Sequence, residues 1–97
     1  MSFRIIYTNG YLKRAKKFIK RHPELLPQYE KTLKLLELNP SHPSLRLHRL
    51  GGTLRELHSV SINISYRITL EFLLEDGKIV LVNVGSHDEV YGLVLRS

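Results

Sequence analysis

The sequence has no cysteine and no tryptophan, and it contains only one methionine among 97 residues. Without cysteine there is no disulfide framework, no thiolate metal site and no cysteine nucleophile. No apolar run approaches the roughly 18–20 residues that a membrane-spanning helix needs. Residues 1–7 also lack the charged start, long apolar core and cleavage site of a signal peptide. We therefore expect a cytoplasmic protein without a membrane partner.

Acidic residues are scarce in the first half of the chain, and the charge is therefore uneven. Residues 1–49 hold eleven Lys and Arg against three Glu, whereas residues 50–97 hold four basic and six acidic residues. A basic half of this kind is typical of proteins that bind a polyanion or an acidic partner, although a solvated helix face gives the same pattern. The length and the ordinary composition, 42% hydrophobic and 25% charged, predict a single domain over residues 1–97.

Apolar residues spaced three to four apart predict two amphipathic helices, at about residues 11–21 and 24–38. The turn at residues 8–10 offers an N-cap for the first helix. His22 and Asn39 each precede a proline, and such residues avoid the α region, so they mark the two helix ends. The short link predicts an antiparallel helical hairpin.

Alternation of polar and apolar residues over residues 59–72 predicts two strands joined by a tight turn near residues 61–64. An Asp-Gly pair within residues 75–78 predicts a second hairpin turn. Residues 79–84 are apolar at nearly every position and predict a central strand that ends at Gly85.

With a first strand at residues 3–7, the element order is β-α-α-β-β-β. This order predicts an α+β domain in which the helical hairpin packs on one face of a small antiparallel sheet.

Five residues on these strands and their flanks are suited to chemistry. Arg67 is the lone cation of the alternating strand, and its planar guanidinium can hold a phosphate through two parallel hydrogen bonds. His87 follows the apolar strand, with Tyr91 four residues later, and histidine exchanges protons near neutral pH. His48 and His58 flank a pair of glycines and are further candidates.

Each candidate also has an ordinary structural explanation. A histidine at a strand end is often a hydrogen-bonded surface residue, and Tyr91 can fill the core with its hydroxyl in water. Arg67 can pair with Glu56 or Glu71 across strands. Three of the histidines can form a metal site, but none has a short ligand spacing such as His-x-x-x-His, and we expect no metal. The chain also lacks a phosphate-binding glycine loop and a nucleophile-elbow serine.

Three short segments follow the strand and the basic helical hairpin in a characteristic order. Residues 45–52 form a Leu-x-x-His-x-Leu-x-Gly-like segment, residues 66–68 read Tyr-Arg-Ile, and residues 82–91 read Val-x-x-Gly-x-His-x-x-x-Tyr. With these segments, residues 3–91 resemble the RelE/ParE superfamily of toxins from bacterial toxin–antitoxin pairs. Within it the chain is most similar to the YafQ-type and RelE-type messenger-RNA interferases.

The resemblance implies a toxin that cleaves messenger RNA, typically on the translating ribosome, and that a cognate acidic antitoxin holds inactive. Such a cut uses the 2′-hydroxyl of the RNA itself and needs no metal or cofactor. It requires a base for that hydroxyl, positive charge at the phosphate and an acid for the 5′ leaving oxygen.

The resemblance also implies a role for each candidate residue. His87 matches a catalytic histidine, which we assign as general acid, and Arg67 matches the arginine on the scissile phosphate. Tyr91 matches a tyrosine that stacks on or orients the nucleotide, and His48 matches a functional histidine of YafQ-like members. His58 matches a histidine in an Arg-x-x-His segment and is our first candidate for general base.

The chain departs from the family pattern around this base. Glu56 is the substitute for His58 as general base. The functional aspartate of YafQ-like toxins has no clean counterpart here, because the nearest residue is Asn63, whose amide cannot act as a base. The pair of strand lysines found in RelE-like toxins is absent, with His58 and Val60 in their places.

The basic residues of the first half are predicted to contact ribosomal RNA phosphates through salt-dependent, sequence-independent interactions. They are Lys13, Arg14, Lys16, Lys17, Lys20, Arg21, Arg46 and Arg49. The same face of the first helix, or the groove of the hairpin, is also a place for an acidic antitoxin helix.

Two other functions fit the same fold. A ParE-like toxin inhibits DNA gyrase by binding and without catalysis, but such toxins generally lack the combination of Arg67, His87 and Tyr91. The third reading is a degenerate homologue that serves as a simple interaction module.

Overall fold

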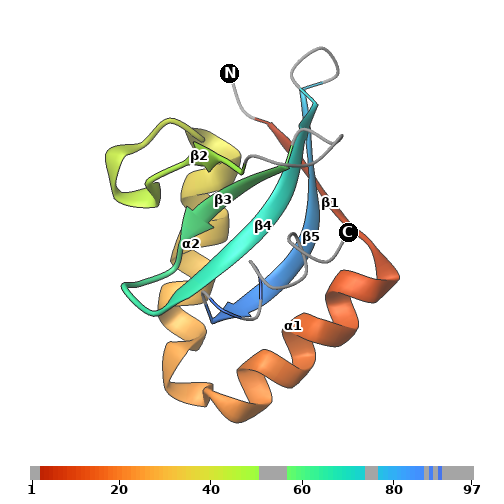
Figure 1. Ribbon diagram of the computed structural model, residues 1–97, viewed down its shortest axis with the longest axis vertical. Helices are drawn as coiled ribbons and strands as arrows, with labels where there is room; N and C mark the ends of the chain where they lie inside the picture. Colours follow the sequence, from red (N-terminus) through yellow and green to blue (C-terminus); the bar gives the residue numbers. More distant parts are fainter. Residues whose placement is uncertain (1–2, 51–56, 74–76, 87, 89, 91–97) are drawn as a thin grey trace.

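Five strands and two α-helices make up the part of the chain that the computed structural model describes, residues 3–50, 57–73, 77–86, 88 and 90 (Figure 1). In chain order the elements are β1 (Arg4–Tyr7), α1 (Asn9–Arg21), the 3₁₀ turn η1 (Pro23–Leu25), α2 (Leu26–Leu38), the 3₁₀ turn η2 (Pro43–Leu45), β2 (His48–Arg49), β3 (Leu57–Ser61), β4 (Tyr66–Leu73) and β5 (Lys78–Ser86). The predicted α+β class is confirmed, and the predicted order β-α-α-β-β-β gains one strand, the two-residue β2. No helix in these ranges is long and apolar enough to cross a membrane.

The sheet is mixed, with the strand order β1-β5-β4-β3-β2. Strands β2 to β5 pair antiparallel, but β1 lies parallel to β5, with Ile5 opposite Ile79 and Ile6 opposite Val80. The expected all-antiparallel sheet is wrong at this edge. The alternation of a strand reports which face is buried, but it does not report the direction of the neighbouring strand. The chain between β1 and β5 contains both helices and strands β2 to β4, which leaves ample length for a parallel pairing.

Helix α1 begins at the predicted cap and ends at the predicted residue. The Thr8 hydroxyl accepts a hydrogen bond from the Tyr11 amide at 3.1 Å. At the other end, the His22 amide donates to the carbonyls of Phe18 and Ile19. The helix therefore ends before Pro23, whose ring prevents its preceding residue from continuing the helix.

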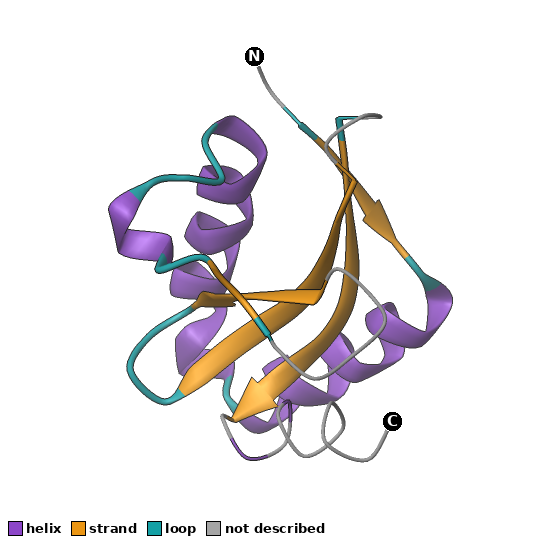
Figure 2. Ribbon diagram, turned by 45° about the horizontal axis from the view of Figure 1, so that its top comes forward, coloured by secondary structure: helices purple, strands orange, loops and turns teal. Residues whose placement is uncertain are grey.

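Both helices pack on the same face of the sheet, as predicted. Buried side chains from α1 and α2 form one core with alternate residues of β3, β4 and β5, among them Tyr11, Tyr29, Val60, Ile68 and Leu81. The two helices run in opposite directions and diverge from the η1 connection (Figures 1 and 2). Between them, the hydroxyls of Tyr11 and Tyr29 are 2.6 Å apart.

Strands β3 and β4 form the predicted hairpin. The connecting bend covers residues 62–65, and the Asn63 side-chain oxygen accepts from the amides of Ser65 at 2.8 Å and Tyr66 at 2.9 Å. An asparagine that bonds to the backbone two and three residues ahead stabilises a tight turn. Asn63 therefore has a structural role at the start of β4.

Strand β5 is central, as predicted, but it continues through Gly85 to Ser86. The prediction that Gly85 ends the strand is wrong, because Gly85 stays in the ladder opposite Arg67. A register shift between Thr69 and Leu70 places Leu70 opposite Leu81 and Thr69 opposite Asn83. Gly77 has a φ of +63° just before the strand, the conformation that glycine adopts most readily in a hairpin turn.

Candidate active site

Strand β4 divides its side chains between the two faces of the sheet. Ile68 and Leu70 are fully buried against the helices. Because successive strand residues point to opposite faces, Arg67 and Thr69 lie on the face away from α1 and α2, which we call the distal face. The arginine that the sequence singled out is therefore outside the helix–sheet core.

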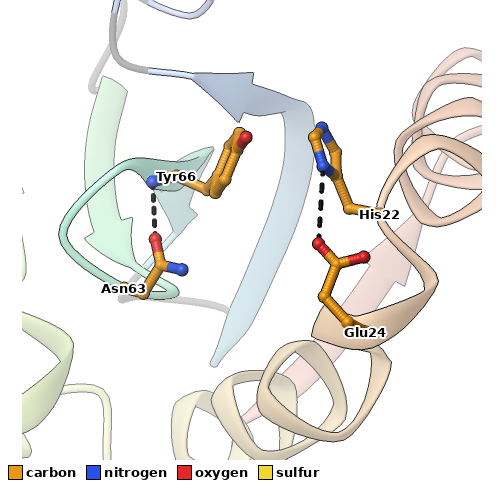
Figure 3. Close-up of polar contacts among 4 residues, drawn as sticks. All are labelled: His22, Glu24, Asn63 and Tyr66. Carbon is orange, nitrogen blue, oxygen red and sulfur yellow. Dashed lines mark hydrogen bonds and ion pairs between the residues drawn. The ribbon is translucent and has the colours of Figure 1, made fainter.

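Tyr66, the residue before Arg67, is held on the helix face by an aromatic cluster (Figure 3). Its ring centre lies 4.7 Å from that of His22 and 5.2 Å from that of Phe18. The His22 imidazole nitrogen Nδ1 is also 3.8 Å from a Glu24 carboxylate oxygen. This cluster fixes the start of β4 against the end of α1, and so fixes the direction in which Arg67 leaves the strand.

Arg67 is half-buried and is bonded on one side only. Its Nη1 donates a short hydrogen bond to the hydroxyl of Ser61, which lies directly opposite on β3. Its Nε is buried and has no hydrogen-bond partner among the residues that the structure describes. A buried donor without a partner costs about 1–3 kcal/mol, and more for a charged group, so an acceptor that reaches this N–H would recover that cost.

The predicted alternative, an ion pair between Arg67 and Glu71, is not the contact that Arg67 makes, because its partner is the Ser61 hydroxyl. Glu56, the other carboxylate considered, lies outside the described residues.

Small polar side chains surround Arg67 on the distal face. Ser59, Ser61, Thr69 and Asn83 are all buried. The Thr69 hydroxyl donates to the Asn83 carbonyl at 3.5 Å, and the Asn83 side-chain oxygen accepts from the Val84 amide at 2.9 Å. A patch of this composition suits a polar ligand better than an apolar one.

His48 shares the distal face with Arg67. It lies opposite Ser59, which in turn lies opposite Thr69, so two strand spacings, about 10 Å in all, separate β2 from β4. His48 is exposed, and its Nδ1 is 3.3 Å from the Arg46 carbonyl oxygen. When Nδ1 carries the proton and donates it to that carbonyl, Nε2 is the basic nitrogen of the neutral ring.

His58 lies on the other face of the sheet. It pairs with Leu70, whose side chain is fully buried in the helix–sheet core. Paired residues of an antiparallel ladder point to the same face, so the His58 side chain points away from the face of Arg67. The register therefore does not place His58 beside Arg67, and His48 is the described histidine that shares the face of Arg67.

Two of the predicted site residues, His87 and Tyr91, lie outside the described residues. The last residues of β5 pair with the start of β4, with Gly85 opposite Arg67 and Ser86 opposite Tyr66. Among the described residues, no group of three or more His, Asp or Glu side chains is arranged to hold a metal ion.

The predicted RNA-binding residues are all exposed: Lys13, Arg14, Lys16, Lys17, Lys20, Arg21, Arg46 and Arg49. One of them, Arg14, also donates to the Val82 carbonyl at 3.3 Å and so joins α1 to β5. Arg46 has a φ of +50°, a backbone conformation that non-glycine residues seldom adopt. Arg49 pairs with His58 and therefore leaves the sheet on the face opposite to that of His48.

Comparison with known proteins gives a consistent set of structural relatives. No protein-family model matches the sequence, and no curated protein sequence matches it. Among solved structures, the E. coli DinJ–YafQ toxin–antitoxin complex matches with a TM-score of 0.76 and 19% identity over 95% of this chain and 100% of that chain. A metal-bound toxin from Helicobacter pylori has a TM-score of 0.69 and 22% identity, over 91% of this chain and 98% of that chain. The archaeal RelE–RelB complex from Pyrococcus horikoshii OT3 has a TM-score of 0.68 and 17% identity, over 89% and 96%.

This chain has the RelE-like fold. The matches cover about nine-tenths or more of this chain and nearly the whole of each related chain. Within the RelE-like fold, residue chemistry is the guide to function, because one fold hosts several functions.

Sequence patterns did not single out Ser61, the hydrogen-bond partner of Arg67. A serine in an alternating strand carries no signal of its own, and its role depends on the register of the hairpin. The turn at residues 62–65 determines that register, and a change of one residue there exchanges the faces.

Proposed function

We propose that this protein is the toxin of a toxin–antitoxin pair and an endoribonuclease that cleaves messenger RNA by attack of the RNA 2′-hydroxyl. The main observation behind this proposal is Arg67, a half-buried cation on the distal face whose Nε–H has no partner in the described part of the chain. The RelE-like fold supports the toxin role, because YafQ with this fold was crystallised in a toxin–antitoxin complex.

The reaction needs no group beyond side chains. A base removes the proton of the 2′-hydroxyl, the 2′-oxygen bonds to phosphorus, and the bond from phosphorus to the 5′-oxygen breaks. The products are a 2′,3′-cyclic phosphate and a 5′-hydroxyl, which receives its proton from a general acid. Charge on the phosphate oxygens grows on the way to the transition state, so a cation placed there lowers the barrier.

Arg67 is the proposed contact to the scissile phosphate, because its guanidinium presents two parallel N–H groups to two oxygens. His48 is the proposed general base, acting through Nε2 while Nδ1 faces the Arg46 carbonyl. His87 is the proposed general acid and Tyr91 the residue that orients the nucleotide. Gly85 lies opposite Arg67 and precedes His87 by two residues in the sequence. This short separation supports the assignment of His87 as general acid.

The partners belong to the same proposal. Messenger RNA is the substrate and the ribosome the site of cleavage, with ribosomal RNA phosphates bound by the exposed basic residues of α1. An acidic antitoxin is the expected protein partner. Its binding surface would combine the basic face of α1 with apolar Leu12 and Tyr7, which are 48% and 45% exposed.

The test is inducible expression in bacteria, with messenger-RNA 5′ ends mapped by primer extension. We expect new ends inside reading frames with the wild type, far fewer with Arg67→Lys and His48→Ala, and fewer with His87→Ala. Arg67→Lys keeps the positive charge but lacks the planar pair of donors, so it tests the bidentate contact. His58→Ala is the matched control, because His58 lies on the other face of the sheet.

Growth arrest without new RNA ends would overturn the endoribonuclease proposal. Double-strand DNA breaks in the arrested cells would then indicate a ParE-like gyrase inhibitor. A culture that neither stops growing nor shows new ends would indicate an interaction module without toxin activity.

A further inference from the structure

The ladder leaves Arg67 with one flanking side chain. On β3 it faces Ser61, whose hydroxyl accepts from Nη1, and on β5 it faces Gly85, which has no side chain. Ser61 is itself buried, so water does not compete freely with Arg67 for the Ser61 hydroxyl. The Ser61–Arg67 bond therefore joins two residues that the hairpin already places side by side.

The geometry of guanidinium gives this bond a direction. A guanidinium has two edges that present parallel N–H groups, one formed by Nη1 and Nη2 and one formed by Nε and Nη2. Ser61 holds Nη1, and the buried Nε has no partner in the described ranges. The edge that Ser61 leaves for a bidentate oxyanion is therefore the one formed by Nε and Nη2.

We propose that Ser61 is a positioning residue, which anchors Nη1 so that Arg67 presents its Nε–Nη2 edge to the phosphate. This inference rests on the proposed endoribonuclease function and deepens it. A free arginine side chain samples many rotamers, and a bound phosphate must select one of them. Fixing the fork beforehand removes that cost from the reaction, and the benefit is largest where the geometry must be accurate, at the transition state.

Single-turnover cleavage of a defined messenger RNA in a reconstituted translation mixture tests the proposal. We expect Ser61→Ala to lower the rate at saturating protein about tenfold, with little change in the concentration for half-saturation. Ser61→Thr, which keeps the hydroxyl and suits a strand, is expected to restore most of the rate. Thr32→Val is the control, because it also removes a buried hydroxyl, but from α2 and not from the distal face.

A double variant separates positioning from a general effect on the fold. If Ser61 acts through the arginine fork, Ser61→Ala has no further effect in an Arg67→Lys background, because the lysine ammonium has no planar fork to orient. A full Ser61→Ala effect in that background would overturn the proposal. Equal rates for Ser61→Ala, Thr32→Val and wild type would overturn it too.

An NMR titration that involves no RNA cleavage tests the role of Ser61 separately from the proposed endoribonuclease activity. The Nε–H resonance of Arg67, assigned by its loss in Arg67→Lys, is followed while an uncleavable RNA with 2′-deoxy nucleotides is added. We expect a shift that saturates in the wild type and is weaker in Ser61→Ala. Such a shift in a protein that cleaves no RNA would refute the endoribonuclease and keep the Ser61 role. No shift in a wild type that does cleave RNA would refute the presented edge and keep the endoribonuclease.

Discussion

Tyr11 and Tyr29 bring two hydroxyls together inside the core between the helices. Tyr11 is fully buried and Tyr29 is 8% exposed, with their oxygens 2.6 Å apart. Burial raises the pKa of both phenols, because the ionised form loses its hydration. Burial also raises the pKa of Tyr7, whose ring lies 6.3 Å from that of Tyr11. All three are therefore neutral in the folded protein at physiological pH.

These phenols predict a loss of stability in alkali. Their pKa values in the folded state lie above the value of about 10 for an exposed tyrosine, so the unfolded chain releases its phenolic protons first. The stability that depends on neutral phenols is complete below pH 10 and falls as the pH rises further. Urea denaturation at pH 8 to 11 measures this fall, which we expect to be shallower in the Tyr11→Phe/Tyr29→Phe double variant. The same slope in wild type and double variant would contradict the prediction.

At the residue scale, the sequence predicts that Arg67 lies outside the core, but it does not predict which side chains lie beside Arg67. Alternation within β4 is local, and it separates Arg67 from the core residue Ile68. Which β3 residue lies opposite Arg67 depends on the turn. A turn at residues 61–64 would bring His58 opposite Arg67, but the observed partner is Ser61, three positions later. An odd shift moves every side chain to the other face, and it exchanges a histidine for a serine beside the arginine.

Single elements follow short-range signals, and the start of α1 shows this most directly. The Thr8 hydroxyl satisfies the Tyr11 amide, one of the four N–H groups that a helix start leaves without a partner. Replacing Thr8 with Ala is expected to lower the free energy of unfolding by about 1 kcal/mol. Urea denaturation measures the change.

Thr8→Ser is the control for this cap, because serine retains the hydroxyl and caps helices at least as well. It should unfold near the wild-type midpoint. Equal losses in both variants would show that the threonine methyl group, and not the hydrogen bond, is what stabilises the helix start.

Strand partners are less predictable than helix ends. The hairpin of β3 with β4 follows from local alternation and a turn, whereas the pairing of β1 with β5 joins the two ends of the described chain. No local pattern in residues 3–7 specifies a parallel neighbour some seventy residues away. The helices between them cover one sheet face and so bring β1 to the exposed edge of β5 (Figure 2).

At the scale of the whole molecule, the sheet separates two kinds of surface. One face holds the apolar core with α1 and α2, and the distal face holds Arg67 among buried serine, threonine and asparagine side chains. The positive charge of the first half is carried largely by α1, whose lysines are exposed along its outer side. The proposed chemistry and the proposed charge-based binding therefore lie on different parts of the molecule, and substitutions should affect them separately.

This separation predicts two distinct classes of variant. Lys16→Gln/Lys17→Gln is expected to weaken RNA binding and to reduce the slope of log affinity against log salt by about 0.7–0.9 for each phosphate that the variant no longer neutralises. Its cleavage rate at saturating protein should match the wild type, because neither lysine lies on the distal face. Arg67→Lys should do the reverse, slowing cleavage while leaving the salt slope nearly unchanged, since it keeps its charge.

The matched control for the charge change is Lys31→Gln/Lys34→Gln on α2. These two lysines are also exposed, so the variant removes the same net charge from another surface. Lys34 lies 4.0 Å from Glu37. Binding titrations at several salt concentrations distinguish a local contact from net charge. If the α2 pair lowers the slope as much as the α1 pair, long-range attraction and not the α1 face controls RNA binding.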